Sequence, residues 1–232
     1  MKKAVLHWSG GKDAAFCLYM LRNSKQVKIE KLLTTISEPY NRISMHGVRS
    51  ELLDKQVESL GIPLEKIALT EMPSMDDYET ALKNKLIELK MKGLNVSVFG
   101  DIFLEDIKSY RERILSEINV GLVFPLWHIH TTKLSKEFIT AGFKAKVVCV
   151  DARYLDKDFA GLDYNMDFIN ALPKNLDPCG ENGEFHTFVY AGPGFQKPVD
   201  FMPGEKVYRE YKMAAGSIPV SGFWFCDLIP NK

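Results

Sequence analysis

The chain has 232 residues, of which 46% are hydrophobic and 26% charged, and its formal net charge is +0. This composition is typical of a folded globular protein, and the balanced charge argues against a broad electrostatic grip on nucleic acid. No apolar run approaches membrane-spanning length and no signal-peptide core is long enough, so we expect a cytoplasmic protein with no membrane contact. The four cysteines show no CxxC spacing, which indicates neither a zinc knuckle nor a disulfide framework.

Apolar runs alternate with amphipathic helical patterns through the first 150 residues. Strands are predicted at 4–7, 31–36, 67–69, 96–99, 121–125 and 145–150, and helices at 14–21, 46–60, 75–93, 105–120 and 134–141. Ser74 and Asp76 are the N-cap candidates of the third helix. Strands that alternate with helices of this length predict right-handed crossovers and a parallel sheet.

The residue pattern changes after Asp151, where turn residues become more frequent and the hydrophobic periodicity less regular. The last stretch, from about 188 onward, has the pattern of short strands separated by Gly and Pro. We therefore expect two domains, one over 1–150 and a smaller α+β domain over 151–232.

Residues 9–14, SGGKDA, connect the first predicted strand to a helix. The two glycines leave backbone N–H groups pointing at one spot beside a helix N-terminus, which suits a phosphate. Ser9 as an ordinary N-cap with Lys12 as a solvated residue is the alternative. The carboxyl end of a parallel strand is where open α/β sheets bind ligands, and this place favours the phosphate interpretation.

Two further stretches, FGDIFLED (99–106) and PLWHIH (125–130), end neighbouring strands and should share that sheet edge. Lys12 could neutralise phosphate charge there. Asp13 could face Mg²⁺, fix the loop, or simply favour the helix dipole. His46 and Gly47 stand at a predicted helix start, where an adenine or ribose could rest, and a capping turn is the equal alternative.

A second polar cluster occupies DPCGENGEFHTFVY, residues 177–190. Asn182-Gly183 is a strong hairpin-turn signal, and the following residues predict the returning strand. Glu181, Glu184 and His186 place two carboxylates and an imidazole around this turn, with Glu184 and His186 on one face of the strand. Such a trio can hold Mg²⁺, orient an amine nucleophile or accept a proton.

The loop SGGKDA resembles the SGGKD(S) loop of the N-type ATP pyrophosphatases, the PP-loop proteins. Together with it, MHGVR (45–49), FGDI (99–102), SYRER (109–113), GLVFPLW (121–127) and CGENGEFHT (179–187) are similar to the diphthine–ammonia ligase family. The resemblance implies a HUP-like parallel sheet with helices on both faces, and a smaller C-terminal α+β domain beside a shared cleft. It also implies that ATP is split to AMP and pyrophosphate, through an acyl-adenylate that ammonia attacks.

With this resemblance, three sets of residues are predicted for the site, with ATP and Mg²⁺ as cofactors. The catalytic set is Lys12, Asp13, Glu181, Glu184 and His186, with Asp13 as the magnesium ligand. The ATP-binding set is Ser9, Gly10, Gly11, Lys12, Asp13, His46, Gly47, Gly100 and Asp101. The substrate-binding set is Tyr110, Arg113, Gly180, Gly183 and Thr187. Of the neighbouring arginines 111 and 113, one should lie on the surface, because they do not share a helix face.

Two departures from the family pattern bear on the substrate, a small-molecule or protein-borne carboxylate. Ala14 stands where the loop usually has serine, and ENGEFHT stands where EGGEYET is typical, with His186 in place of glutamate. The variant is similar to a bacterial subgroup linked to cobalamin salvage, so a corrinoid acid is one expected substrate. A tRNA-modifying PP-loop enzyme and a non-catalytic ATP-binding sensor are the alternatives. Free ammonia is the expected nitrogen source, and a homodimer is left open.

Overall fold

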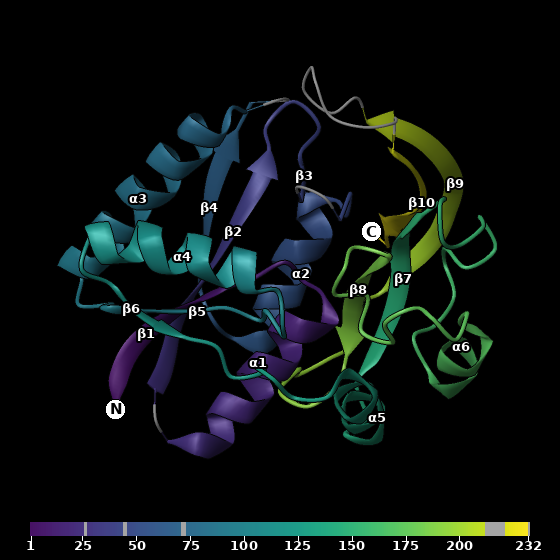
Figure 1. The fold of residues 1–232 in the computed structure, drawn as a ribbon, viewed down its shortest axis with the longest axis horizontal. Coiled ribbons are helices and arrows are strands. Elements are labelled where there is room, and N and C mark those ends of the chain that lie inside the picture. Colours follow the sequence, from purple (N-terminus) through teal and green to yellow (C-terminus); the bar gives the residue numbers. More distant parts are fainter. Residues whose placement is uncertain (26, 44–45, 71–72, 212–220, 232) are drawn as a thin grey trace.

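Two sheets form the framework of the protein (Figure 1). The computed structural model describes residues 1–25, 27–43, 46–70, 73–211 and 221–231. The first sheet contains β1 (Lys2–His7), β2 (Val27–Ser37), β3 (Arg42–Ile43), β4 (Leu64–Leu69), β5 (Val96–Val98) and β6 (Gly121–Val123). The second contains β7 (Lys144–Asp151), β8 (Phe185–Ala191), β9 (Phe201–Tyr211) and β10 (Ser221–Pro230). The helices are α1 (Lys12–Ser24), α2 (Ser50–Leu60), α3 (Met75–Met91), α4 (Glu105–Glu117), α5 (Thr131–Thr140) and α6 (Met166–Ala171).

The first sheet is mostly parallel, with β1 at its centre. β1 pairs in parallel with β2 on one side and with β5 on the other, so that Leu6 lies between Leu32 and Val98. β4 adds to β2 and β6 adds to β5, both in parallel, whereas the short β3 runs antiparallel to β2. The expected fold class, a mostly parallel sheet flanked by helices with a separate smaller domain, is confirmed.

Helices cover both faces of this sheet because successive side chains of a buried strand point to opposite sides. Ala4 and Leu6 of β1 belong to a core cluster that includes buried residues of α1 and α2. Val5 belongs to a second cluster, which includes Leu86 of α3 and Ile114 of α4. The middle of β1 is thus buried on both faces, and the cleft lies at its carboxyl end.

The helix ends follow their local sequence. Ser74 caps α3 in a reciprocal capping box with Asp77, which selects it over Asp76 as the N-cap. α2 begins at Ser50 and not at His46 as predicted, because Val48 and Arg49 pair in bridges with the β3 turn. His46 and Gly47 therefore lie in the connection before α2. Met45 of the MHGVR motif lies outside the described residues.

The strand at 145–150 is predicted to close the parallel unit, and this prediction is wrong. It forms β7 and pairs antiparallel with both β8 and β10. The hydrophobic run specifies a buried strand but not the sheet that contains it, since both neighbours come later in the chain. The division of the chain at residue 150 thus falls at the end of a strand of the second sheet.

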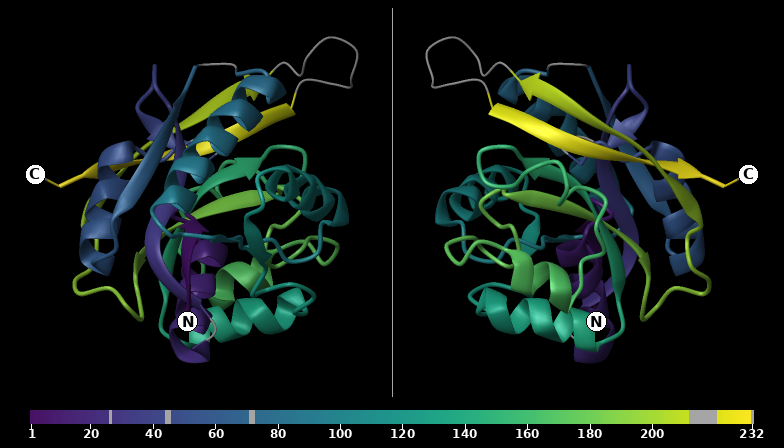
Figure 2. Two further views of the ribbon diagram at one scale, coloured as in Figure 1. Left: turned by 90° about the vertical axis from the view of Figure 1, so that its left-hand side faces the viewer. Right: turned by 90° about the vertical axis from the view of Figure 1, so that its right-hand side faces the viewer.

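The second sheet has the order β8-β7-β10-β9. Its last two strands form a long ribbon across one end of the molecule, where short strands were expected (Figure 2). Residues 212–220 of that stretch lie outside the described residues. Val147 and Phe188 share a core cluster with Ala15 of α1 and Leu52 of α2. The two sheets thus share one core, and the amino end of α1 meets β8.

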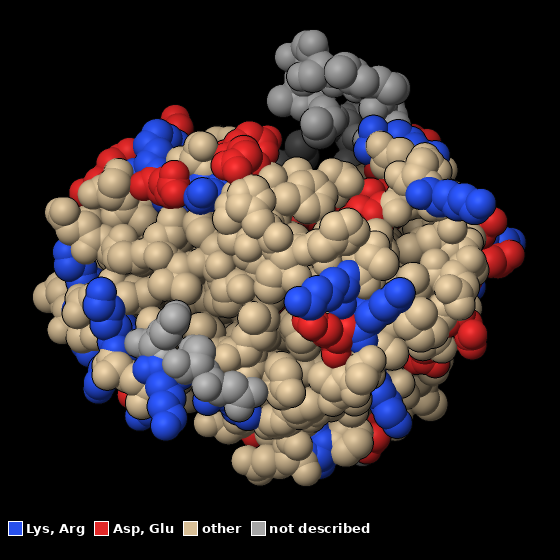
Figure 3. Space-filling model, turned by 60° about the horizontal axis from the view of Figure 1, so that its bottom comes forward, with Lys and Arg blue, Asp and Glu red and all other residues tan. Residues whose placement is uncertain are grey.

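The surface agrees with the balanced composition. On the face shown in Figure 3, acidic and basic side chains are interspersed around a broad uncharged middle. Among the helices of the described residues, none has the length and apolar character that spanning a membrane requires.

Candidate active site

A cleft of about 1580 Å³ lies at the carboxyl ends of β1, β2, β4 and β5 and reaches the second sheet. It collects most of the predicted site residues from both sheets. Those that line it are Ser9, Gly11, Lys12, Asp13, His46, Gly47, Gly100, Asp101, Gly180, Glu181, His186 and Thr187. The predicted convergence is present for the loop at 9–14 and the segment after β5, but no residue of the third stretch, 125–130, lines the cleft. Residues of the second motif, just before and within β8, line it as well.

The glycine loop is fastened to β8 by backbone hydrogen bonds. The Gly10 carbonyl accepts from the Val189 amide at 2.9 Å, and the Lys12 amide donates to Thr187 Oγ1 at 3.0 Å. The buried Gln56 of α2 also joins Gly10 to Val189, since its Nε2 donates to the carbonyls of Gly10 (3.0 Å) and Val189 (2.6 Å). No sequence pattern singled out Gln56, because its role depends on contacts with two distant segments.

Glycine is required in the loop for two different reasons. Gly10 has a φ of +77°, which side chains disfavour. Gly11 has an ordinary φ, but a Cβ there would stand 3.1 Å from both the Thr187 carbonyl oxygen and His46 Cε1. The hydrogen bonds of the described residues leave the amides of Asp13 and Ala14, at the start of α1, without a protein acceptor. Unpaired amides at a helix N-terminus have the geometry that suits an anion, and phosphate binding at this loop stays a prediction.

Lys12 is buried, with 4% of its surface exposed, so the interpretation of a solvated lysine is wrong. Its Nζ lies 2.7 Å from both carboxylate oxygens of Asp13, near the rings of Tyr164 and Phe185. Burial lowers the pKa of Lys12, but Asp13 and the other acidic groups around it more than offset this and raise the pKa above its ordinary value. The ammonium group is therefore retained at neutral pH.

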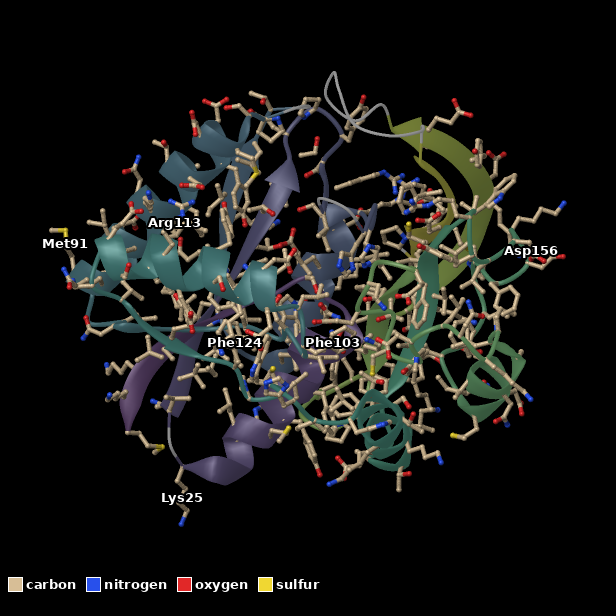
Figure 4. The ribbon with its side chains drawn as sticks, in the orientation of Figure 1. Lys25, Met91, Phe103, Arg113, Phe124 and Asp156 are labelled. Carbon is tan, nitrogen blue, oxygen red and sulfur yellow. The ribbon has the colours of Figure 1, made fainter. Side chains whose placement is uncertain are left out.

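Glu181 connects the second motif to the edge of the first sheet. Its Oε1 accepts from the Ile102 amide at 2.7 Å and from the Phe103 amide at 3.4 Å. Figure 4 labels Phe103, which lies between α4 and β8. Burial raises the pKa of Glu181 to about 7; the Ile102 hydrogen bond opposes the shift and Asp13 adds to it. A carboxyl group with this pKa exchanges protons near neutral pH, as a general base requires.

Glu184 does not join this group. Its side chain is buried, it does not line the cleft, and its Oε1 accepts from the Asp177 amide (3.3 Å) and Asn182 Nδ2 (3.0 Å). Asp177 in turn accepts from the Glu181 amide at 2.8 Å. Glu184 therefore shapes the 177–184 turn that holds Glu181, and the predicted trio around the turn does not form.

The predicted hairpin is also wrong in its pairing. Residues 185–191 form β8 as expected, but β8 pairs with β7, so the turn at Gly183 does not join two paired strands. Gly183 has a φ of +86° and, like Glu184, does not line the cleft. Gly180 does line it, and a Cβ there would stand 2.9 Å from the Phe185 carbonyl oxygen.

Two histidines lie beside the loop. The rings of His46 and His186 are 4.6 Å apart, and His46 Nδ1 lies 3.3 Å from the Thr187 carbonyl oxygen. Burial lowers the pKa of His46 to about 4, although its contact with Thr187 opposes the shift. Burial, with His46 and Lys12 adding to it, holds the pKa of His186 well below its usual value. Both imidazoles are therefore neutral at pH 7.

The segment after β5 approaches the start of α1 closely. A Cβ on Gly100 would stand 3.2–3.3 Å from backbone atoms of Asp13 and Ala14. Asp101 accepts two hydrogen bonds from Arg111, at 2.7 and 3.0 Å, and the Arg111 guanidinium lies 4.1 Å from the centre of the Phe99 ring. Of the two arginines that the sequence offered, Arg111 lines the cleft and the predicted Arg113 does not.

The structure does not bring Tyr110 and Arg113 to the cleft. They are three residues apart on α4, so they share a face, and that face is turned from Arg111. Tyr110 packs against the core cluster of α3 and α4, while the exposed Arg113 pairs with Glu79 and Glu117. Figure 4 labels Arg113 beside α3, remote from the second sheet. Their predicted substrate contacts have no support in this arrangement.

A cluster of ionised residues joins the two sheets at the far end of the cleft. Asp227 of β10 accepts from Arg42 at 2.8 Å and from Arg49 Nη2 at 2.6 Å. Burial opposes ionisation here, but the hydrogen bonds from Arg49 and Arg42 lower the pKa of Asp227 below its usual value. Nowhere among the described residues do three or more His, Cys, Asp or Glu side chains form a group that could hold a metal ion.

The fold and the cleft define an α/β protein in which a glycine loop after the first strand faces an antiparallel sheet. The diphthamide synthase N-terminal domain family matches residues 1–122, and the diphthamide synthase C-terminal domain family matches residues 130–218. The chain belongs to the diphthamide synthase family, which confirms the family predicted from its motifs.

Two individual relatives agree with this assignment. A Danio rerio protein named diphthine–ammonia ligase is 22% identical over 218 residues, which cover 82% of this chain and 83% of the relative. A Homo sapiens protein of the same name is 29% identical over 150 residues, and the match spans 62% of this chain and about half (54%) of that relative. A crystal structure titled as a predicted subunit of tRNA methyltransferase from Methanocaldococcus jannaschii is 14% identical, covers 86% of this chain and 100% of its own, and has a TM-score of 0.41.

Proposed function

We propose that this protein is an ATP-dependent ligase that joins ammonia to a carboxylate, the reaction type suggested by its relatives named diphthine–ammonia ligase. One observation carries the proposal: the Lys12 amide and Thr187 Oγ1 join the glycine loop to the second motif, 3.0 Å apart, within one cleft. The proposed anion site and the carboxyl group of Glu181, whose pKa is about 7, then face the same cleft.

ATP fits the loop on chemical grounds. The free amides of Asp13 and Ala14 suit phosphate oxygens, and Gly11 lets the loop pack closely against Thr187. Lys12 supplies a positive charge that is retained at neutral pH and offsets charge on the leaving pyrophosphate. Ala14 contributes its amide where the usual serine would add a hydroxyl.

Asp13 is the candidate ligand for Mg²⁺. Mg²⁺ commonly takes one or two protein carboxylates and completes its shell with water and substrate phosphates, so a single carboxylate at the loop suffices. When bound, the ion would offset phosphate charge. Asp13 would then exchange part of its contact with Lys12 for the ion.

The reaction has two displacements. The substrate carboxylate oxygen attacks the α-phosphorus of ATP, the bond from that phosphorus to the bridging oxygen breaks, and pyrophosphate leaves. Ammonia then attacks the acyl carbon of the adenylate, the bond from carbon to the AMP oxygen breaks, and AMP leaves. The nitrogen gives up one proton on the way to the amide. We assign its acceptance to Glu181, which lines the cleft and has a pKa of about 7.

Product analysis tests this proposal. ATP labelled at the α-phosphate is incubated with ammonium and either a diphthine-bearing protein or a corrinoid carboxylic acid, and nucleotide and amide products are measured. AMP, pyrophosphate and amide in equal amounts are expected with the accepted acid, and none without it. Lys12→Ala is the variant that lowers ATP affinity, and Lys157→Ala is the exposed control. ADP and phosphate as products would refute the proposal.

The same experiment separates the remaining functions. The relatives are named for diphthine, so diphthine is the first acid to test, and the corrinoid acid finds no support in those names. ATP binding without AMP formation with any acid would favour the sensor. Turnover that depends on tRNA would favour the tRNA-modifying enzyme.

A further inference from the structure

Strand β9 is the edge of the second sheet, and its outer side has no partner strand among the described residues. The strand is eleven residues long. Residues 205–210 are exposed on both faces, including Val207 (37%) and Tyr208 (44%). A long strand of this kind presents unpaired backbone N–H and C=O groups, which another strand can complete.

The two faces of β9 have different surroundings. Glu205, Val207 and Arg209 line the cleft, and Val207 lies opposite Phe225 of β10. On the other face, the Tyr208 ring lies 5.1 Å from that of Trp224. Any strand that adds to β9 would therefore continue the wall of the cleft with its own side chains.

The sequence of β9 is complementary to itself. When two copies of a strand pair antiparallel about a two-fold axis, each residue lies opposite a residue of the other copy on the same face of the sheet. With the axis at Val207, the two Val207 residues lie opposite each other, and Glu205 of each copy lies opposite Arg209 of the other. The next register in one direction, with the axis at Lys206, would place two lysines face to face.

We propose that β9 pairs antiparallel with β9 of a second copy of this chain, with the two-fold axis at Val207. The pairing joins two four-stranded sheets into one and forms two Glu205–Arg209 ion pairs on the cleft side. Arg209 of the second copy then stands at the rim of the first copy's cleft, so the dimer extends the wall of each site.

Charge reversal tests the register. Sedimentation velocity over a range of concentrations is expected to show a dimer, and Glu205→Arg should raise its dissociation constant about ten-fold, since two attractive pairs become repulsive. The double variant Glu205→Arg/Arg209→Glu should restore it. Glu112→Arg, on the exposed face of α4, is the matched control and should leave it unchanged.

Cross-linking tests the axis directly. Antiparallel partners have Cα atoms about 4.5–5.5 Å apart, within the range of a disulfide. The four native cysteines are free and buried, so the introduced thiol is the accessible one. Val207→Cys should form a covalent dimer, Glu205→Cys alone should not, and Glu205→Cys/Arg209→Cys should. A monomer at every concentration, or a dimer that Glu205→Arg does not weaken and Val207→Cys does not cross-link, would overturn the proposal.

Discussion

The backbone amide of Lys12 donates to the hydroxyl of Thr187, 175 positions later in the chain, at 3.0 Å. Both residues are buried, and this contact joins the loop after β1 to β8 of the second sheet. A buried amide needs an acceptor, so the hydroxyl holds the loop in the conformation that leaves the next amides of α1 free. The geometry of the anion site therefore depends on the C-terminal part of the chain.

Replacing Thr187 by Val should destabilise the loop, although the two side chains have nearly the same volume. Valine has nearly the shape of threonine but leaves the Lys12 amide unsatisfied, which costs about 1–3 kcal/mol. We expect a loss of that size in the free energy of unfolding in urea, and a rise in KM for ATP of at least several-fold. Thr187→Ser keeps the hydroxyl and should recover most of both. A valine variant with native KM would show that the contact does not shape the site.

As the proposed base, Glu181 should give the reaction a dependence on pH. A base must be ionised to accept a proton, and the pKa of Glu181 is about 7, so kcat should rise between roughly pH 6 and 8 and then level off. Glu181→Gln keeps an acceptor for the Ile102 amide but cannot take a proton. It should lower kcat by about 10²-fold or more and abolish this rise, with little change in KM for ATP. A glutamine variant with the native pH profile would assign the base to another group.

Glu181 should also lower the free energy of unfolding at high pH. Because its pKa is raised in the folded state above the ordinary 4.5, the folded protein holds a proton that the unfolded chain has lost. Stability therefore falls as the pH rises from about 4.5 to about 7. Glu181→Gln removes this loss and should be more stable than wild type by about 1–3 kcal/mol at pH 8, but not at pH 4. Urea unfolding at the two pH values measures the difference.

The local pattern of the sequence predicts most strands and helices of the first sheet, but not β3 or the start of α2. Periodicity marks β1, α1 and α3 because each buries one face or both against a neighbour, and the glycine loop follows from its place after a strand. Periodicity carries no information about which strands are neighbours. The strand β7 was therefore assigned to the wrong sheet, although its buried character was predicted correctly.

The site was predictable only as far as single motifs define it. Ser9, Gly11, Lys12 and Asp13 of the loop line the cleft, as does Glu181, since strand ends and motif spacing fix their places. Gly10 was predicted with them but does not line it, and its carbonyl instead accepts from Val189 of β8. On α4, spacing separates Arg111 from Arg113 but does not say which face meets the cleft. The role of Gln56 could not be predicted, because it depends on hydrogen bonds to two segments that are distant in the sequence.

Lys12 and Glu184 should affect different kinetic constants. Lys12→Ala removes a charge at the anion site and should raise KM for ATP by about ten-fold or more. Glu184 lies behind the turn that holds Glu181, so Glu184→Ala should lower kcat with a small effect on KM. Glu184→Gln keeps the acceptor for the Asp177 amide and should recover part of kcat, as expected of a positioning residue. Equal loss of ATP affinity in both alanine variants would contradict this division.

The contact of Asp227 with Arg42 and Arg49 should stabilise the junction of the two sheets at neutral pH and lose its effect in acid. Its pKa is lowered in the folded state below the ordinary 3.8, so its contribution is present above that value and is lost as the pH falls through the folded pKa. Asp227→Asn should cost about 1 kcal/mol at pH 7, a value discounted for the exposure of the arginines. The difference from wild type should shrink as the pH falls below 3.8, the ordinary value. Asp54→Asn removes an exposed partner of Lys66 within the first unit and is the matched control. An asparagine variant whose deficit is the same at both pH values would mean that packing, and not the ionised carboxylate, holds β10 against the first unit.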